Sequence, residues 1–480
     1  MAPRPENPAV QGSSSAKVLL LLSGWAVAAW LIVAPRVDPI SVSFDSSGKP
    51  GPPPKSELEK AFDKWAADPS LDGASIGFCV LDSSGETLYA SPLAETALCP
   101  ASALKTMTTA AALDLLGPEF RFETTLHGTA VIGPDGVLPG DLVLVGGGDP
   151  TLSTEDLEAM VAEVMKAGLK QVTGRVTVDA SIFPTQAVND HWNWGDIGNA
   201  YGVGAFGVNV NHNRLEIPFD PGAKVGDPAT LRSGLLVTKD TRWINRVTTG
   251  AAGSGDQVVV YSQPYGRTIT LQGTVPLDEA PFTVTGAIPD PPAVVGEYLT
   301  KALQQKGVKL LGRESMAAKP AAKLASHQSV PLPEIIDHLH RVSDNLEAQC
   351  LFLMIGRLQK LDPVKALRSY WEKRGVYFTG LRLIDGSGLA RATMIRPIDL
   401  AKVNHVARHG SHGDRFRQSL TAYLDGSVRA KLGAMSGVKT EVGFLTLPDG
   451  REVTFALMAN GLDPAVNFWP LREQLLRSIR

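Results

Sequence analysis

Cysteine is scarce in this chain of 480 residues, which contains only Cys79, Cys99 and Cys350. Small domains that depend on disulfides are dense in cysteine, so this sparse set excludes a disulfide-stapled scaffold. Three cysteines cannot all pair within one chain. A Cys79–Cys99 bridge stays open for an exported protein, but we expect three small, buried apolar residues with free thiols. Cys99 is not expected to be a nucleophile, because no histidine-bearing motif accompanies it.

The chain also lacks an excess of charge of either sign. Lysine and arginine number 46 against 49 aspartate and glutamate residues, and the formal net charge is -3. Proteins that bind nucleic acids carry a strong basic patch, so this balance gives no reason to expect a nucleic acid as a partner. The substrate class therefore has to come from the motifs.

A continuous apolar run occupies Val18–Ala34, before the pair Pro35–Arg36. It is long for a signal-peptide core and short for a comfortable membrane span. No clean small-x-small cleavage site stands out before Pro35, which favours an uncleaved signal anchor over a cleaved signal peptide in residues 1–35. Either segment predicts export, to the periplasm or to the outer face of the cytoplasmic membrane, with the inner membrane as a partner of the N-terminal segment. Residues 36–55 are rich in Pro, Gly and Ser and are expected to form a flexible tether.

A serine and a lysine three residues apart, Ser102 and Lys105, stand at the start of an expected helix. Residues with this spacing share one helical face, so a hydroxyl and an amine lie one turn apart. The N–H groups of a helix N-terminus favour developing negative charge. A serine needs a base within hydrogen-bond reach to act as a nucleophile, and a lysine with a lowered pKa can be that base. The same spacing fits an N-capping serine and a solvated lysine, so the pair alone decides nothing.

Two further tripeptides follow in the chain, Ser343-Asp344-Asn345 and Lys431-Leu432-Gly433. The motifs S-x-x-K, S-D-N and K-T-G, in this order, are the signature of serine β-lactamases and penicillin-binding proteins. Two of the three match, and the third has leucine where threonine is expected. The order and context of the set favour a serine acyl-transfer site.

The flanks of these motifs narrow the resemblance. From about Ser56 to its C-terminus, the chain resembles the low-molecular-mass class C penicillin-binding proteins, the D-Ala-D-Ala carboxypeptidase/endopeptidases. Beside the S-D-N tripeptide, the matching segments are Pro100–Ser102, Leu116–Phe120, Val145–Leu152, Gly174–Val176, Val178–Asp179, Trp192–Trp194, Tyr201–Gly202, Asp385–Leu389 and Gly426–Lys431. The resemblance implies peptidoglycan peptide stems as the substrate and β-lactams as covalent inhibitors.

The resemblance also implies roles for five catalytic residues. Ser102 attacks the carbonyl of the penultimate D-alanine and Lys105 takes its proton. Ser343 relays a proton to the leaving nitrogen together with Lys431. Asn345 binds the substrate backbone and holds Lys105 in place. The mutual repulsion of the two lysines would help to keep one amine neutral.

Substrate binding is implied for the residues after Lys431. The oxyanion hole would consist of the backbone N–H groups of Ser102 and Ala434, with Gly433, the last residue of the motif, next to this second donor. Leu432 replaces the threonine whose hydroxyl helps to bind the terminal carboxylate in the family, and it supplies no hydrogen bond. It could therefore weaken carboxypeptidase activity, favour endopeptidase cleavage, or mark a binding protein with little activity.

The predicted fold class is α/β (α+β), a β-lactamase/transpeptidase-like domain split by a large, mostly β insert of one or two domains. A chain of 480 residues exceeds one hydrophobic core. The first two motifs also lie too far apart for a single-domain β-lactamase. We assign residues 56–126 and 331–480 to the catalytic domain and residues 127–330 to the insert. Helices are expected at 332–340, 346–358, 363–374 and 464–479, and a hairpin at 438–447 and 452–459.

Three hypotheses stand: an active serine D,D-peptidase, a non-catalytic peptidoglycan-binding relative, and a β-lactamase. The long insert and the lack of an identifiable deacylating glutamate count against the last. No cofactor or metal is expected. The G-x-G-x-x-G match at Gly202–Gly207 lacks the strand, helix and acidic residue of a dinucleotide site. His405, His409 and His412 have no Cys or acidic partner in ligand register.

Overall fold

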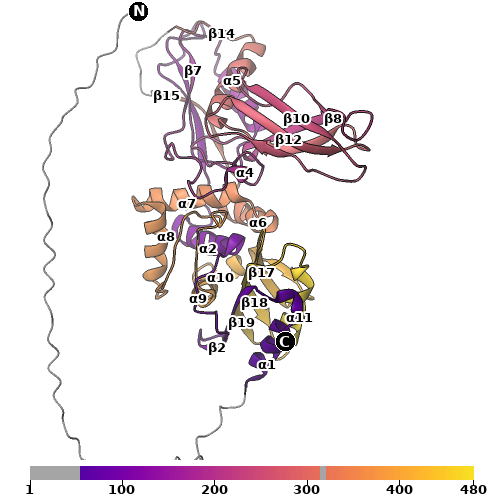
Figure 1. Ribbon diagram of the computed structural model, residues 1–480. Coiled ribbons are helices and arrows are strands. Elements are labelled where there is room, and N and C mark those ends of the chain that lie inside the picture. Colours follow the sequence, from indigo (N-terminus) through magenta and orange to yellow (C-terminus); the bar gives the residue numbers. More distant parts are fainter. Residues whose placement is uncertain (1–54, 314–319, 480) are drawn as a thin grey trace, which may run out of the picture. The chain divides into compact units, whose positions relative to one another are not determined.

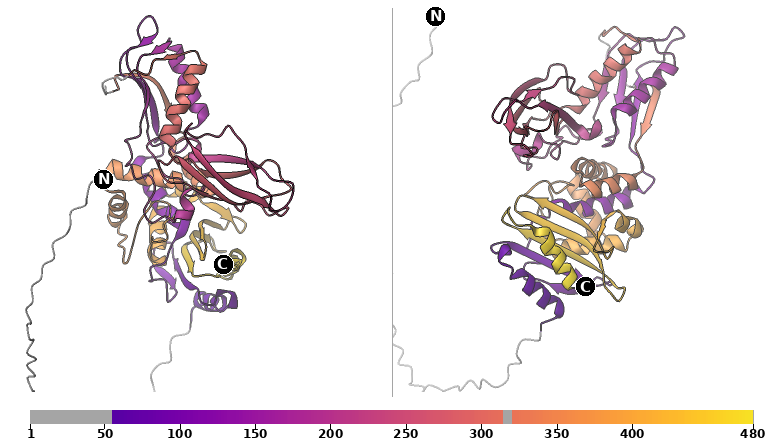
Figure 2. Two further views of the ribbon diagram at one scale, coloured as in Figure 1. Left: turned by 45° about the horizontal axis from the view of Figure 1, so that its top comes forward. Right: turned by 90° about the vertical axis from the view of Figure 1, so that its right-hand side faces the viewer.

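The computed structural model of this protein describes residues 55–313 and 320–479. The predicted signal segment and residues 36–54 of the predicted tether lie outside these ranges. Lys55–Arg480 groups into one compact unit, shown in Figures 1 and 2. None of the helices formed by the described residues is long and apolar enough to cross a membrane.

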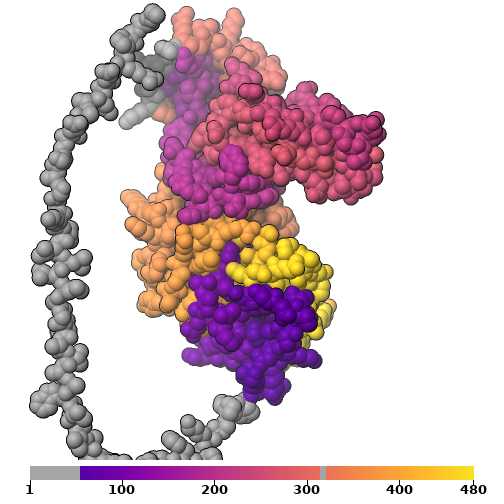
Figure 3. Space-filling model, viewed as in Figure 1, coloured from indigo at the N-terminus to yellow at the C-terminus, as the bar shows by residue number. Residues whose placement is uncertain are grey.

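A six-stranded antiparallel sheet brings together the two ends of the described chain. Its strand order is β16-β17-β18-β19-β1-β2, so the N-terminal strand β1 pairs with the C-terminal strand β19 (Figure 1). The strand bounds are β1 Ser75–Leu81, β2 Thr87–Ala90, β16 Thr421–Tyr423, β17 Val428–Met435, β18 Val438–Thr446 and β19 Glu452–Asn460. The predicted hairpin is confirmed as β18 and β19. Figure 3 shows indigo N-terminal residues beside yellow C-terminal ones.

One face of the sheet packs on two helices, α1 (Glu57–Ala66) and α11 (Phe468–Ser478). The aromatic rings of Phe62, Trp65 and Phe468 are buried there. The hydroxyl of Ser56 accepts a hydrogen bond from a first-turn N–H of α1 at 3.1 Å, which is the capping expected of a serine before a helix.

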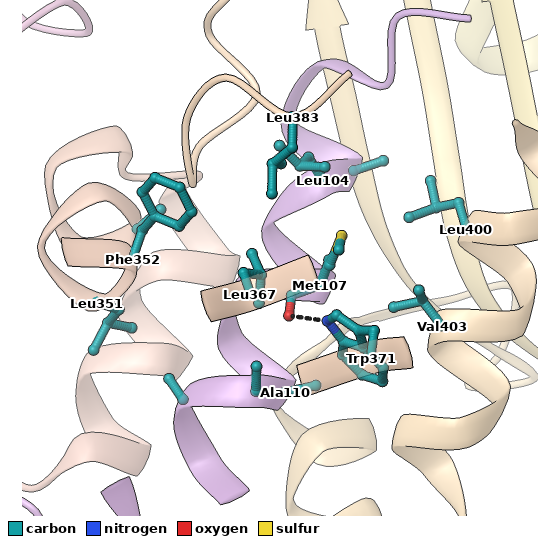
Figure 4. Close-up of a cluster of buried hydrophobic side chains, with 14 of the residues drawn as sticks. Leu104, Met107, Ala110, Leu351, Phe352, Leu367, Trp371, Leu383, Leu400 and Val403 are labelled. Atoms are coloured by element: carbon teal, nitrogen blue, oxygen red, sulfur yellow. Dashed lines mark hydrogen bonds between the residues drawn. The ribbon is translucent and has the colours of Figure 1, made fainter. Parts of the chain in front are cut away.

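The other face carries a cluster of helices around α2 (Lys105–Leu116), which is buried on almost all sides. The surrounding helices are α6 Leu332–Val342, α7 Asn345–Gln359, α8 Pro363–Glu372, α9 Pro397–Arg408 and α10 Gly413–Ser419. Figure 4 shows Trp371 of α8 in this core, where its indole N–H donates to the backbone carbonyl of Met107 at 3.2 Å. Close packing of this kind fixes α2, and with it the residues at its start.

An insert lies between Phe122 and Ser329. The chain leaves the first domain after Phe122 and returns to it at Ser329, and at this point the backbone N–H of Phe122 donates to the Oγ of Ser329 at 3.0 Å. The insert has its own hydrophobic core, and its described residues form one four-stranded and three three-stranded sheets. Its strands are β3 Glu123–Gly128, β4 Val137–Leu138, β5 Leu142–Val145, β6 Gln171–Val172, β7 Val176–Asp179, β8 Arg214–Asp220, β9 Thr230–Leu231, β10 Arg242–Gly250, β11 Val259–Tyr261, β12 Thr268–Pro276, β13 Phe282–Ala287, β14 Lys309–Leu310 and β15 Ala322–Gln328. Its helices are α3 Thr154–Lys166, α4 Trp194–Ile197 and α5 Pro291–Gln305.

The predicted fold class is confirmed, and α6, α7 and α8 match the three helices expected at 332–374. Helices α3 and α5 in the insert were not expected, although Ser153 and Asp156 form a capping box at the start of α3. The predicted limits of the domains stay a prediction.

One detail of the sequence analysis needs correction. The C-terminal helix begins at Phe468 and not at 464, because a turn precedes it in which the Val466 N–H donates to the Asp463 carbonyl. The expectation for the cysteines is confirmed: Cys79, Cys99 and Cys350 are all free and buried, and the alternative Cys79–Cys99 bridge is absent.

Candidate active site

Ser102 and Lys105 lie one turn apart at the junction of a short 3-10 helix, η2 (Ala101–Leu104), and α2. The Nζ of Lys105 is 2.8 Å from the Oγ of Ser102. Ala101, just before the serine, has a left-handed φ of 46°. A residue with a side chain rarely adopts this conformation, and such strain gathers at functional sites. The spacing of the S-x-x-K motif thus produces the expected contact between hydroxyl and amine.

Lys105 is completely buried and has two further partners beside the serine. Its Nζ donates to the Oδ1 of Asn345 at 2.5 Å and to the backbone carbonyl of Ser387 at 2.8 Å. Burial, followed by the positive charge of Lys431, holds the pKa of Lys105 well below its usual value. A neutral amine has two N–H donors and one lone pair. Because the two carbonyl oxygens take both donors, the lone pair is left for the hydroxyl of Ser102.

The second lysine, Lys431 on β17, contacts the second serine. Its Nζ donates to the Oγ of Ser343 at 2.9 Å and to the Leu432 carbonyl at 2.8 Å. Burial lowers the pKa of Lys431 to about 8. The two lysines therefore differ in their tendency to lose a proton, since burial and the charge of Lys431 hold the pKa of Lys105 well below its usual value, whereas Lys431, with a pKa of about 8, keeps its proton at pH 7. Such a difference separates a base from an acid within one site.

The S-D-N tripeptide forms a sharp turn between α6 and α7. Ser343 ends α6 in the left-handed conformation, with a φ of 61°. Asp344 caps α7 by accepting a hydrogen bond from the backbone N–H of Glu347 at 2.9 Å, and Asn345 is the first residue of that helix. The turn presents Ser343 to Lys431 and Asn345 to Lys105, so each outer residue of the tripeptide meets one lysine.

Strand β17 supplies the remaining candidate residues. A Cβ atom on Gly433 would lie 2.9 Å from the Pro100 carbonyl oxygen and from the Ala103 nitrogen, so only glycine permits this approach to η2. Strand β16 pairs only with the first three residues of β17, which leaves the edge of β17 open beyond them. The Leu432 carbonyl faces Lys431 Nζ, and the two-residue repeat of a strand is expected to turn the N–H of Ala434 to the same open edge.

The side chain of Leu432 lies at the margin of this group. Leu432 pairs with Glu441 on β18, and the buried Glu441 side chain bonds to Arg472 of α11. Directly opposite residues share one face of a sheet, whereas Lys431 projects to the other face. The leucine therefore leaves the contacts among the two serines, the two lysines and Asn345 intact.

Residues 58–468 match the D-Ala-D-Ala carboxypeptidase 3 (S13) family. This chain belongs to that family. The D-alanyl-D-alanine carboxypeptidase of Actinomadura sp. (strain R39) is 32% identical over 449 residues, which cover 85% of this chain and 81% of the relative. The D-alanyl-D-alanine carboxypeptidase DacB of Haemophilus influenzae is 26% identical over 423 residues, which cover 81% of this chain and 86% of the relative.

Solved structures share the fold of this chain. The crystal structure of penicillin binding protein 4 (dacB) from Haemophilus influenzae has a TM-score of 0.75 and is 22% identical, and it covers 88% of this chain and 98% of its own. A structure of the same protein complexed with a novel β-lactam has a TM-score of 0.72 at 23% identity, with the same shares of the two chains covered. The resemblance predicted from the sequence is confirmed, and the chain has the fold of the penicillin-binding proteins.

In this S13-family chain, two backbone carbonyls complete the site that the motifs begin. The carbonyl of Ser387 accepts from Lys105, and the carbonyl of Tyr201, in the insert, accepts from the Nδ2 of Asn345 at 2.8 Å. The loop that carries Ser387 also contains Asp385, whose buried carboxylate accepts a hydrogen bond from the indole N–H of Trp192 at 2.7 Å. The loops of Ser387 and Tyr201 both lie in segments that carry the family resemblance. The sequence could not identify their carbonyls as hydrogen-bond acceptors, because every residue type has a backbone carbonyl.

The histidines weighed in the sequence analysis do not form a group of possible metal ligands with a carboxylate or thiol among the described residues. The rings of His405 and His409 lie 4.4 Å apart between centroids, and His409 Nδ1 bonds to the carbonyl of His405 at 2.9 Å. A different set, His212, His338 and Glu347, does come together, although its members are far apart in the sequence.

Proposed function

We propose that this chain is an exported serine D,D-peptidase that acts through an acyl-enzyme on Ser102. Its substrates are the D-Ala-D-Ala terminus of peptidoglycan peptides, the D,D-cross-links between them, or both. The observation that carries the proposal is the set of contacts at Lys105, whose buried Nζ donates to two carbonyl oxygens and lies 2.8 Å from the Oγ of Ser102.

Acylation begins with a proton transfer. The hydroxyl of Ser102 gives its proton to Lys105, and Oγ attacks the carbonyl carbon of the penultimate D-alanine. The lysine becomes an ammonium ion next to two carbonyl oxygens that stabilise its charge. The oxyanion that forms on the substrate accepts from the N–H groups of Ser102 and Ala434, and each such donor contributes roughly 3 kcal/mol.

The leaving group needs a proton on the amide nitrogen. Ser343 donates its hydroxyl proton to that nitrogen and recovers one from Lys431, whose Nζ is 2.9 Å away. The bond between carbonyl carbon and nitrogen then breaks, and the terminal residue leaves as an amine. Lys431 suits this role because its lowered pKa of about 8 keeps it charged at neutral pH and yet eases proton release.

Water hydrolyses the ester in the second half of the reaction. A water molecule gives one proton to a neutral lysine of the pair, and its oxygen attacks the ester carbonyl. Ser102 recovers its proton as the acid product leaves, so the net reaction is hydrolysis. All of these transfers use side chains of the described site.

The non-catalytic alternative rests on Leu432. The contacts of the five catalytic candidates are made despite the leucine, which supports an active enzyme. The family resemblance still implies that a threonine at this position helps to bind a free carboxylate, so the leucine favours substrates without one beside the scissile bond. For the location, the apolar run at 18–34 supports export to the periplasm or to the outer face of the cytoplasmic membrane.

Fluorescent penicillin tests the proposal. The protein is incubated with the reagent, and covalent labelling and its decay are followed with time. Stable labelling is expected of a D,D-peptidase with slow release of the acyl group. Absence of labelling would support the non-catalytic relative, and rapid turnover would support a β-lactamase. Hydrolysis of D-Ala-D-Ala peptides and of cross-linked peptides then divides carboxypeptidase from endopeptidase activity.

A further inference from the structure

Three possible ligands of a metal ion meet beside the S-D-N turn. They are His212 in the 3-10 helix η3 (Asn211–Asn213) of the insert, His338 on α6 and Glu347 on α7. One ligand atom from each lies within 4.8 Å of the others. The Oε1 of Glu347 is 2.8 Å from the Nδ1 of His338 and 4.0 Å from the Nδ1 of His212.

The group contains polar atoms whose hydrogen-bonding capacity is unused. The Glu347 side chain is only 1% exposed, and its Oε2 has no hydrogen-bond partner among the described residues. The Nδ1 of His212 is likewise buried, and the same described part of the chain offers it no hydrogen bond. Buried polar atoms without partners are rare in native proteins, and an ion that the atoms bind is one explanation.

The surroundings leave room for an ion and a further ligand. A cavity of about 360 Å³ opens here, lined by all three residues. The carboxylate of Asp344 lies 3.6 Å from His212 Nδ1 and is paired with Arg214 at 2.8 Å. The carboxylate of Asp344 therefore already has a cationic partner, whereas the carboxylate of Glu347 contacts the imidazoles of His212 and His338.

The donor set selects the class of ion. Two imidazole nitrogens and one carboxylate suit Zn²⁺, Co²⁺ or Ni²⁺, whereas Mg²⁺ and Ca²⁺ prefer oxygen ligands alone. Tetrahedral Zn²⁺ with bonds near 2.0 Å places its ligand atoms about 3.3 Å apart. The gap between His338 and Glu347 must therefore widen slightly from 2.8 Å, and that between His212 and Glu347 must shorten from 4.0 Å.

We propose that His212, His338 and Glu347 form a binding site for a zinc-type divalent ion, with water in the open position. The ion connects the insert to α6 and α7, the two helices joined by the turn that carries Ser343 and Asn345. It therefore acts as a structural brace for that turn and takes no part in acyl transfer. The three ligands are distinct from the residues of the peptidase reaction proposed above, so the existence of the site does not depend on that reaction.

Zinc titration of the full chain tests this site. After treatment with a chelator and dialysis, ZnCl₂ is added in a calorimeter to the wild type, to His212→Asn and to His409→Asn. Asparagine tolerates the left-handed φ of 54° at position 212 but is a poor zinc ligand. The exposed His409, which pairs with His405, controls for adventitious binding by a surface histidine pair.

The expected result is one equivalent of Zn²⁺ bound by the wild type and by His409→Asn, with affinity about tenfold or more weaker in His212→Asn. Zinc should also raise the Tm of the first two proteins but not of the third. Equal binding by all three proteins, or no stoichiometric binding, would overturn the site. Should His212→Asn fail to fold, Co²⁺ added to the wild type gives an independent answer: strong tetrahedral absorption bands support the site, and weak octahedral bands or none refute it.

Discussion

The Nδ2 of Asn345 donates a 2.8 Å hydrogen bond to the backbone carbonyl of Tyr201, so the insert contacts the S-D-N turn. The other end of the same amide accepts from Lys105 at 2.5 Å. Because an amide has distinct donor and acceptor ends, the bond to Tyr201 fixes which end faces the lysine. The insert thereby orients the acceptor that keeps Lys105 in position.

Asn345→Asp should therefore impair acylation through Lys105. A carboxylate beside the amine favours its charged form, so the pKa of Lys105 rises and less neutral base remains at neutral pH. We expect a slower acylation by penicillin at pH 7 and an acidic limb of the pH–rate profile displaced to higher pH. Rate constants measured across the pH range check this. An acidic limb in the same place as in the wild type would contradict the orientation argument.

Ser102→Ala should abolish covalent labelling by penicillin. Only a hydroxyl is lost at the end of a well-packed helix, so the Tm is expected to stay within a few degrees of the wild type. Gel fluorescence and a thermal scan measure the two effects, and the control is Ser436→Ala, a change of an exposed serine in the turn between β17 and β18. Persistent labelling of Ser102→Ala would exclude this residue as the nucleophile.

Lys105→Arg tests the base itself. A guanidinium remains protonated at every working pH and cannot accept the serine proton. The acylation rate should fall by roughly two or more powers of ten, the scale of general-base catalysis. Stopped-flow or gel-based acylation kinetics measure the rate, and the Tm verifies that the buried arginine is tolerated. A folded variant that acylates at the wild-type rate would remove Lys105 from the mechanism.

The charge of Lys431 should set the alkaline limb of the reaction. Its pKa is lowered to about 8 by burial, so its proton is lost as the pH rises through that value and the acid disappears. Acylation should therefore decline above about pH 8. In Lys431→Arg the overall rate should be lower, but the decline should vanish because guanidinium keeps its charge. The same alkaline limb in both proteins would assign it to another group.

Leu432→Thr tests the substrate preference. The change leaves Gly433 and the N–H of Ala434 untouched, so the oxyanion hole should be unaffected. A hydroxyl able to bind a carboxylate contributes roughly 1.5 to 3 kcal/mol. The kcat/KM for a free D-Ala-D-Ala terminus should accordingly rise more than that for a cross-linked peptide. Equal changes on the two substrates, or a loss on the free terminus, would show that the leucine matches a differently shaped substrate.

Local patterns in the sequence were sufficient for the parts of the site that depend on short-range geometry. Ser102 and Lys105 meet because a helix brings residues three apart onto one face. Helices α6, α7 and α8 follow from apolar periodicity, and the hairpin of β18 and β19 follows from alternation around Pro448–Gly450. The family motifs then placed Ser343, Asn345 and Lys431 in the same site, although spacing alone could not.

Tertiary structure alone decided which groups act on those residues. The carbonyls of Ser387 and Tyr201 are backbone groups, which every residue possesses, so no residue type could reveal them as partners of Lys105 and Asn345. The lowered pKa of Lys105 depends on its complete burial, which arises only when distant helices pack around α2. His212 meets His338 and Glu347 for a similar reason: the chain must leave for the insert and return before the three can share a cavity. Sequence thus determined the local chemistry, and packing between distant segments determined its protonation and its supports.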